Sequence, residues 1–291
     1  MKLVDFLDRK AKFFFILPSV LWLLVITAFP LIYSLLLSFL STGASAWGKF
    51  VGLQNYIALF KNYRFWNSLR ITIMFVASAV GIEMALGIGL ALLLNTEIKA
   101  RKFFRTLFMT PLFATPLALG YLGLILFSEA SGPINTFLYT LGLKKILWFT
   151  NPKAALLSIV IVDVWKWSPF CFLVILAALQ GVPQQIYEAA KLESTSHVAI
   201  FKYITLPLIA PALLTVFLLR TIEAFKVLDI PYALTSGGPG ITTEAYSLYT
   251  YKVGLRFFNF GPASALAYFL MGIILIFCIF FFSKIRSIHE G

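Results

Sequence analysis

Long apolar segments alternate with short polar intervals along the whole chain. A helix needs about 20 predominantly apolar residues to cross the roughly 30 Å hydrocarbon core of a bilayer. Six segments reach or approach that length, near residues 13–40, 68–95, 105–128, 154–180, 205–227 and 260–283. The pattern predicts an all-α integral membrane protein with six transmembrane helices.

Composition agrees with a membrane protein and argues against one that binds nucleic acid. Hydrophobic residues make up 60% of the 291 positions, charged residues only 12%, and the mean hydropathy is +0.90. The net charge of +12 comes from Lys and Arg residues that lie between the apolar segments instead of along one basic face. We therefore expect these Lys and Arg residues to contact the anionic headgroups of membrane lipid, and no nucleic acid.

The basic residues also predict the topology. They are dense in residues 1–12, in the link 99–105 and in the tail 284–291, whereas the opposite loops spread theirs over longer stretches. Because cytoplasmic loops carry the excess of Lys and Arg, segments 1–12 and 284–291 are expected in the cytoplasm, around a membrane domain at 13–283. The first apolar segment is too long for a signal peptide and is expected to stay as an anchor.

Three of the six segments contain charged residues, which are costly in a bilayer unless they face water or a partner. The charges are Glu83 in the second, Asp163 and Lys166 in the fourth, and Arg220, Glu223 and Lys226 in the fifth. Two interpretations are open: Asp163 with Lys166 and Arg220 with Glu223 are i, i+3 pairs within their helices, or these residues line a wet solute path. The uncharged run 206–219 is too short to cross a bilayer, so the rest of the fifth segment is expected to face a wet cavity or a protein interface.

No catalytic, cofactor or metal site is expected. His197 and His289, the two histidines, lie in polar segments, while Cys171 and Cys278 lie within apolar ones. These positions do not form a cluster with the spacing of metal ligands. The glycine-rich run 237–240 lacks the Lys and the Ser or Thr that follow in a phosphate-binding loop. We expect a protein that is not an enzyme and does not hydrolyse ATP itself.

A polar interval at residues 183–204 separates the fourth and fifth apolar segments. Within it, the stretch QQIYEAAKLE at 184–193 predicts a short helix with one small apolar face and one charged face. Pro183 suits the start of that helix, and the hydroxyl residues that follow it suit the cap of a second helix near His197. Such a helix fits a groove of a partner protein, with an amphipathic loop on the membrane surface as the alternative.

This interval, with EAA at 188–190 and ITLP at 204–207, resembles the EAA loop of binding-protein-dependent ABC importer permeases. VGLQNY at 51–56 and TSGGP at 235–239 are similar to the sugar-transporting type of that family. The resemblance implies a cytoplasmic coupling helix between the fourth and fifth spans, seated in a cleft of the ATP-hydrolysing subunit. The residues implied in this contact are Tyr187, Glu188, Ala189, Ala190, Glu193 and Ser194. Glu193 and Ser194 stand where the family usually has an Asp-Gly pair, so the turn after the helix differs from the family's pattern.

The resemblance also implies partners and a location. It implies a multi-pass protein of the plasma or inner membrane that works with a separate ATP-binding subunit, a second related permease and an extracytoplasmic solute-binding protein. The solute is a carbohydrate or a similar polar compound, and a heterodimer of permeases is expected, with a homodimer as the alternative. An ion-coupled secondary transporter is the competing class, in which Glu83, Asp163 and Glu223 are proton or sodium sites.

Aromatic residues near the charges in the fourth and fifth segments suit a sugar, because their flat faces pack against the C–H surfaces of a sugar ring. Packing bulk within a helix bundle is the other interpretation of Trp165 and Trp167. On the first interpretation, the candidate solute path comprises Asp163, Trp165, Trp167, Arg220, Glu223 and Tyr232.

Overall fold

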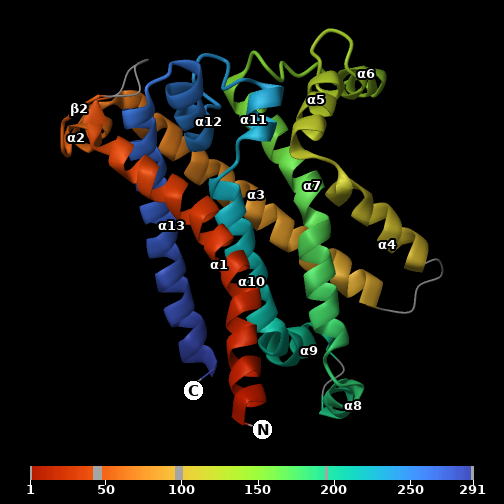
Figure 1. Cartoon of the computed structure of the whole chain (residues 1–291). Coiled ribbons are helices and arrows are strands. Elements are labelled where there is room, and N and C mark those ends of the chain that lie inside the picture. Colours follow the sequence, from red (N-terminus) through yellow and green to blue (C-terminus); the bar gives the residue numbers. More distant parts are fainter. Residues whose placement is uncertain (1, 42–47, 96–100, 194–195, 290–291) are drawn as a thin grey trace. The chain divides into compact units, whose positions relative to one another are not determined.

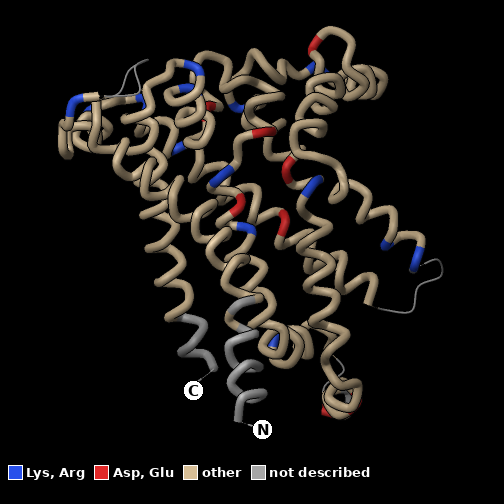
Figure 2. Tube along the Cα trace, viewed as in Figure 1, with Lys and Arg blue, Asp and Glu red and all other residues tan. Residues whose placement is uncertain are grey.

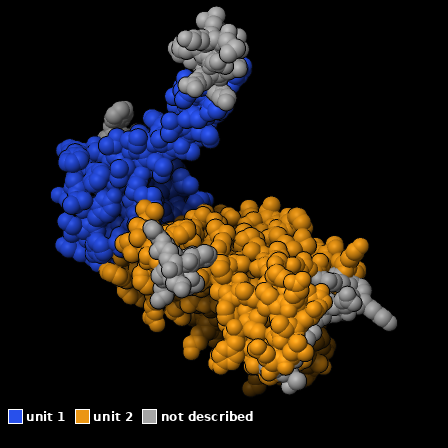
Figure 3. Space-filling view, turned by 90° about the horizontal axis from the view of Figure 1, so that it is seen from below, with its two compact units in different colours: residues 1–62, 250–272 blue, residues 63–249, 273–291 orange. Residues whose placement is uncertain are grey.

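The computed structural model describes residues 2–41, 48–95, 101–193 and 196–289, which are mostly helical (Figure 1). The chain forms two compact units, which Figure 3 shows in different colours. Unit 1 comprises residues 1–62 and 250–272, and unit 2 comprises residues 63–249 and 273–291. Helices α12 (Tyr246–Tyr251) and α13 (Phe260–His289) each pass from one unit into the other.

Unit 1 contains the N-terminal helix and the segment that resembles the VGLxNY stretch. Its elements are α1 (Lys2–Ser38), the antiparallel strands β1 (Leu40–Ser41) and β2 (Lys49–Phe50), α2 (Gln54–Lys61), the π-helical turn η3 (Lys252–Arg256) and the first part of α13. The Asn55 amide donates hydrogen bonds to the carbonyls of Ser38 (2.8 Å) and Leu40 (2.9 Å), and the Tyr56 hydroxyl donates to Ser38 Oγ (2.9 Å). The first of these bonds satisfies a carbonyl that the end of α1 leaves without a helical partner, and the three together tie α2 to the residues that follow α1.

Unit 2 contains the long helices that carry the candidate residues. Its elements are α3 (Tyr63–Asn95), α4 (Arg101–Met109), the 3₁₀ turn η1 (Thr110–Phe113), α5 (Pro116–Leu126), α6 (Pro133–Thr140), α7 (Pro152–Gln180), α8 (Gln184–Glu193), α9 (His197–Ile200), the π-helical turn η2 (Phe201–Thr205), α10 (Leu206–Phe225) and α11 (Asp229–Leu234). Figure 1 shows α6 and α11 near one end of α7, and α8 and α9 near the other.

Helices α3 and α7 pack closely along their length, around buried residues such as Phe75, Ile159 and Phe172. Gly87 allows the closest approach, because a Cβ atom there would lie 2.7 Å from the Cβ of Cys171. Real Cβ atoms do not come so near, so the spacing of these two helices depends on glycine at this position.

Replacing Gly87 by Ala is expected to lower the stability of the protein by about 1–3 kcal/mol, because the added methyl group overpacks the contact between α3 and α7. Gly89 is the matched control, since it lies two residues further along α3 and a Cβ there meets no atom within 4 Å. Thermal unfolding of the purified protein is the measurement. Equal midpoints for Gly87→Ala and Gly89→Ala would show that the contact tolerates a side chain.

The described residues include five helices long and apolar enough to cross a membrane: Phe15–Ser38, Tyr63–Asn95, Pro152–Gln180, His197–Phe225 and Phe260–Ser283. A sixth candidate is a broken pair, Lys102–Phe113 with Pro116–Leu126, bent by 100°. Thr115 is extended before Pro116, and its hydroxyl accepts the Ala118 N–H (3.4 Å), which caps α5. A proline disfavours helical backbone in the residue before it, which explains the break at this point.

The helix that corresponds to the predicted fifth segment starts earlier than the apolar pattern predicts. A continuous helical segment begins at His197 and passes through the π-helical turn η2 into α10. In this turn the Leu206 N–H donates to the carbonyl of Phe201, one residue further back than in an α-helix. Pro207 follows directly and has no N–H to donate, so a wider turn in front of it lets the helix continue.

Candidate functional site

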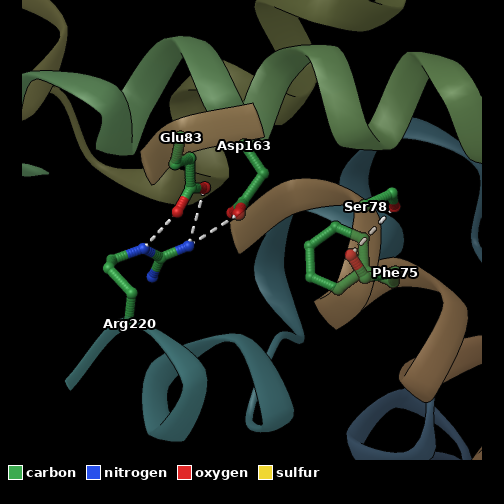
Figure 4. A network of polar contacts seen from close by, with 5 residues as sticks. All are labelled: Phe75, Ser78, Glu83, Asp163 and Arg220. Carbon is green, nitrogen blue, oxygen red and sulfur yellow. Dashed lines mark hydrogen bonds and ion pairs between the residues drawn. The ribbon is translucent and has the colours of Figure 1, made fainter. Parts of the chain in front are cut away.

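A cluster of buried charges joins three of the long helices of unit 2. The Arg220 guanidinium of α10 binds Glu83 of α3 through two hydrogen bonds, Nε to Oε2 (2.6 Å) and Nη2 to Oε1 (2.8 Å). The same Nη2 lies 3.0 Å from Oδ2 of Asp163 in α7. All three side chains are buried, and Figure 4 shows them pointing toward one another. Figure 2 shows acidic and basic positions part-way along these helices.

The structure contradicts the two i, i+3 pairs considered from the sequence, Asp163 with Lys166 and Arg220 with Glu223. Arg220 does not pair with Glu223, which instead binds Lys226 (2.8 Å) at the exposed end of α10. Lys166 does not form an ion pair with Asp163 among the described residues; its Nζ donates to the carbonyl of Ala114 (2.7 Å). The Arg220 guanidinium binds two carboxylates from other helices. Together they accept more of its N–H groups than one carboxylate on its own helix could.

Lys166 and Trp167 connect the charge cluster with the broken span. Ala114 lies in the break between the two segments of the bent pair, so the Lys166 ammonium binds a carbonyl that the interrupted helix leaves free. The Trp167 ring lies 4.6 Å from the Arg220 guanidinium carbon and 5.0 Å from Lys166 Nζ, distances at which a cation is attracted to an indole face. Trp167 therefore helps to hold both cations in place.

A small polar cavity of about 90 Å³ opens beside this cluster. Four of the six residues predicted for the solute path line it: Asp163, Trp167, Arg220 and Glu223. The other two, Trp165 and Tyr232, are not among its lining residues. Trp165 is 46% exposed and Tyr232 is 38% exposed. Trp165 and Trp167 lie two residues apart, which turns them by about 200° around a helix, so they cannot both face one cavity.

The six-residue solute path predicted from the sequence leaves out three charged residues of this site. Lys226 and Asp229 line the cavity, and Glu83 is the main partner of Arg220. A signal for Glu83 was present, because a single carboxylate within a long apolar helix must find a buried partner. The sequence did not indicate that this partner is Arg220, because the two residues lie 137 positions apart. Among the described residues, no group of three or more His, Cys, Asp or Glu side chains is placed to hold a metal ion.

The residues that resemble the EAA loop lie in α8. Glu188, Ala189 and Glu193 are exposed, Ala190 is buried and Tyr187 is half-buried. Ser194 lies outside the described residues. An exposed carboxylate beside an exposed alanine leaves one face of α8 open to a partner, while Tyr187 and Ala190 face the rest of unit 2.

The glycine-rich loop that follows α11 is held by polar contacts. The Thr235 and Thr243 hydroxyls lie 2.7 Å apart, and Thr243 Oγ1 also donates to the carbonyl of Gly238 (2.7 Å). Next to it, the buried Glu244 binds the Arg64 guanidinium at 2.5 and 2.7 Å. These contacts tie the loop to the start of α3.

Comparisons with known proteins identify relatives over most of the chain. The family model described as "Binding-protein-dependent transport system inner membrane component" matches residues 83–286. The trehalose/maltose transport system permease protein MalF of Thermococcus litoralis is 38% identical over 212 residues, which are 73% of this chain and 70% of that protein. The sulfoquinovosyl glycerol transport system permease protein SmoG of Agrobacterium fabrum is 34% identical over 269 residues, 91% of this chain and 86% of that protein.

A solved structure has the same fold. It is a chain of the bacterial alginate ABC transporter, determined in complex with an alginate pentasaccharide-bound periplasmic protein. The TM-score is 0.86, and the alignment covers 99% of this chain and 98% of that chain. The sequence identity is 22%, so the likeness concerns the fold.

Proposed function

We propose that this chain, which belongs to the family of binding-protein-dependent transport system inner membrane components, carries a neutral carbohydrate into the cell. As a member it is a multi-pass permease component of an ATP-binding-cassette importer and not an enzyme. The competing class, an ion-coupled secondary transporter, receives no support from these relatives.

The observation that carries the proposed solute class is the polar cavity beside Arg220. Its lining combines an indole ring with carboxylates and an ammonium group, at the junction of α7 and α10. An aromatic face suits the C–H surface of a sugar, and the polar groups suit its hydroxyls. A cavity of about 90 Å³ is smaller than a sugar, so we propose that it widens when the transporter changes conformation. The relative named for trehalose and maltose agrees with this class.

Uptake into sealed vesicles with ATP inside tests the proposed function. The vesicles hold the complete transporter, its solute-binding protein is outside, and labelled trehalose, maltose and lactose are offered in turn. We expect uptake of at least one sugar that requires internal ATP and does not change when proton and sodium gradients are collapsed. Uptake that follows a gradient without ATP would establish the secondary-transporter class instead.

Replacing Trp167 by Ala is expected to raise the sugar concentration for half-maximal uptake by about ten-fold, because a stacking surface worth about 1 kcal/mol or more leaves the cavity. Glu223→Gln, which keeps the shape of an exposed cavity group, is expected to shift the same value less. The matched control is Trp165→Ala, since Trp165 lies outside the lining. Uptake kinetics are measured with membrane abundance in parallel. Normal kinetics in both cavity variants would remove these residues from the solute path.

The proposed topology has six spans, with both termini in the cytoplasm and the broken pair α4–α5 counted as the third span. It places α8 on the cytoplasmic side, between the fourth and fifth spans. On that side, the exposed Glu188 and Ala189 are available to a cleft of the ATP-binding subunit. Glu188 supplies the charge for a basic partner, and the small Ala189 allows close approach.

The proposed assembly contains two permeases, two ATP-binding subunits and an extracytoplasmic solute-binding protein. One chain offers a single α8, whereas two ATP-binding subunits that close together need two docking helices around a shared path. The solved relative determined with a sugar-bound periplasmic protein agrees with the last of these partners.

We expect the second permease to be a different, related chain. Co-expression of a tagged and an untagged copy of this chain, without any other permease, is expected to recover the tagged copy alone. Addition of the second permease is then expected to recover a one-to-one pair. Recovery of the untagged copy in its absence would establish a homodimer.

A further inference from the structure

A second and much larger cavity lies beside the coupling helix. Its volume is about 1060 Å³, and its lining comes from the ends of α3 and α7, from α8 and α9, and from the π-helical turn η2. Figure 1 shows α8 and α9 together at that end of α7. Small-molecule sites usually measure roughly 300–1,000 Å³, so a disaccharide or trisaccharide has room here.

The chemistry of the lining selects for a neutral ligand. None of the described lining residues is Lys, Arg, Asp or Glu, so an anionic or cationic ligand finds no counter-charge among them. Amide, hydroxyl and imidazole groups both donate and accept hydrogen bonds, as the hydroxyls of a sugar do. The lining includes six such side chains: Asn95, Gln180, Gln184, Tyr187, His197 and Thr205. The ring of Phe201 adds an aromatic face for the sugar's C–H surface.

We propose that this cavity binds the imported sugar on the cytoplasmic side and that its occupation slows further import. The proposal rests on the carbohydrate import proposed above and adds a regulatory site for the same class of solute. This site is separate from the small cavity, because the two share no lining residue.

Position explains why a ligand here acts on transport. Tyr187 lines the cavity from α8. It is next to the exposed Glu188, which we propose docks into a cleft of the ATP-binding subunit. Phe201 and Thr205 line it from the π-helical turn, which leads directly into α10 and so to Arg220. Turns of this type are frequent at functional sites. A ligand that contacts both α8 and the π-helical turn stabilises the one arrangement of α8 and α10 that it fits. It thereby opposes the conformational change that each transport cycle needs.

Preloaded vesicles test this site. The complete transporter imports labelled trehalose, maltose or lactose into vesicles that contain ATP and millimolar unlabelled copies of the same sugar. We expect internal sugar to lower the initial uptake rate at least two-fold, and internal glucose 6-phosphate to have no effect. In Asn95→Leu, which removes hydrogen bonds from the lining, half-inhibition is expected at an about ten-fold higher internal concentration, while uptake into unloaded vesicles is unchanged.

Controls keep the outcomes distinct. Thr205→Val removes one hydroxyl with little change of shape and replaces Asn95→Leu if that variant fails to assemble. Asn259→Leu makes the same amide-to-apolar change at an exposed residue outside the lining and is expected to keep normal inhibition. ATP-driven uptake without inhibition by internal sugar would overturn the regulatory site and leave carbohydrate import standing. Inhibition that persists unchanged in both lining variants would overturn it as well, and uptake of none of the three sugars would contradict the proposed function itself.

Discussion

Replacing Arg220 by Leu is expected to remove most of the protein from the membrane. The change leaves Glu83 and Asp163 buried without their cation, and breaking a buried ion pair in this way costs about 3–5 kcal/mol. A loss of that size is a large part of the stability of a typical protein. The matched control is Lys226→Leu, because the Glu223–Lys226 pair is half exposed and such pairs contribute about 0–1 kcal/mol. Membrane abundance and thermal unfolding are the measurements.

A triple variant separates the structural role of the buried charge cluster from its role in transport. Changing Glu83, Asp163 and Arg220 together to Leu leaves no unpaired charge, and apolar replacement of a buried ion cluster is often neutral or stabilising. We expect abundance to return while uptake stays low, because the small cavity loses Asp163 and Arg220. Recovery of both abundance and uptake would show that the cluster only holds α3, α7 and α10 together. Abundance of Arg220→Leu equal to that of Lys226→Leu would contradict the expected stability loss.

Replacing Glu188 by Lys is expected to abolish ATP-driven uptake, by about a hundred-fold or more, while the protein stays in the membrane. Glu188 is exposed on α8, so the substitution changes stability by no more than about 0.5 kcal/mol. At the proposed contact, however, it places a cation opposite a basic group of the ATP-binding subunit, and juxtaposed like charges cost several kcal/mol. Uptake and recovery of the ATP-binding subunit with a tagged permease are measured side by side.

Two variants check that the effect comes from the charge of Glu188. Glu188→Gln removes the carboxylate charge at constant shape, and we expect a smaller loss than for Lys. Gln185→Lys adds the same cation to an exposed position of α8 and retains Glu188, so uptake is expected to fall at most a few-fold. Parental uptake by Glu188→Lys with the ATP-binding subunit still bound would remove Glu188 from the coupling contact.

The properties that sequence reasoning predicted are local ones. The length of an uninterrupted apolar run sets whether a helix can cross a bilayer, and the mostly helical structure with five or six candidate spans agrees with that expectation. The bend in front of Pro116 has an equally local cause, because proline acts on its own and the preceding residue. Family membership also follows the expectation drawn from the EAA and ITLP stretches.

The partners of the buried charges depend on how distant helices are rotated against one another. Arg220 and Glu223 are near neighbours in sequence, yet Arg220 binds Glu83 and Asp163, because three separate helices turn these side chains toward one point. The rotation of α7 likewise sets Trp167 against Arg220 and leaves Trp165 outside the cavity. Tyr187, which the resemblance places at the contact with the ATP-binding subunit, also lines a cavity of unit 2. Apolar periodicity gives the faces of a single helix, but only packing between helices decides which faces meet, since each contact is a compromise among many side chains of the bundle.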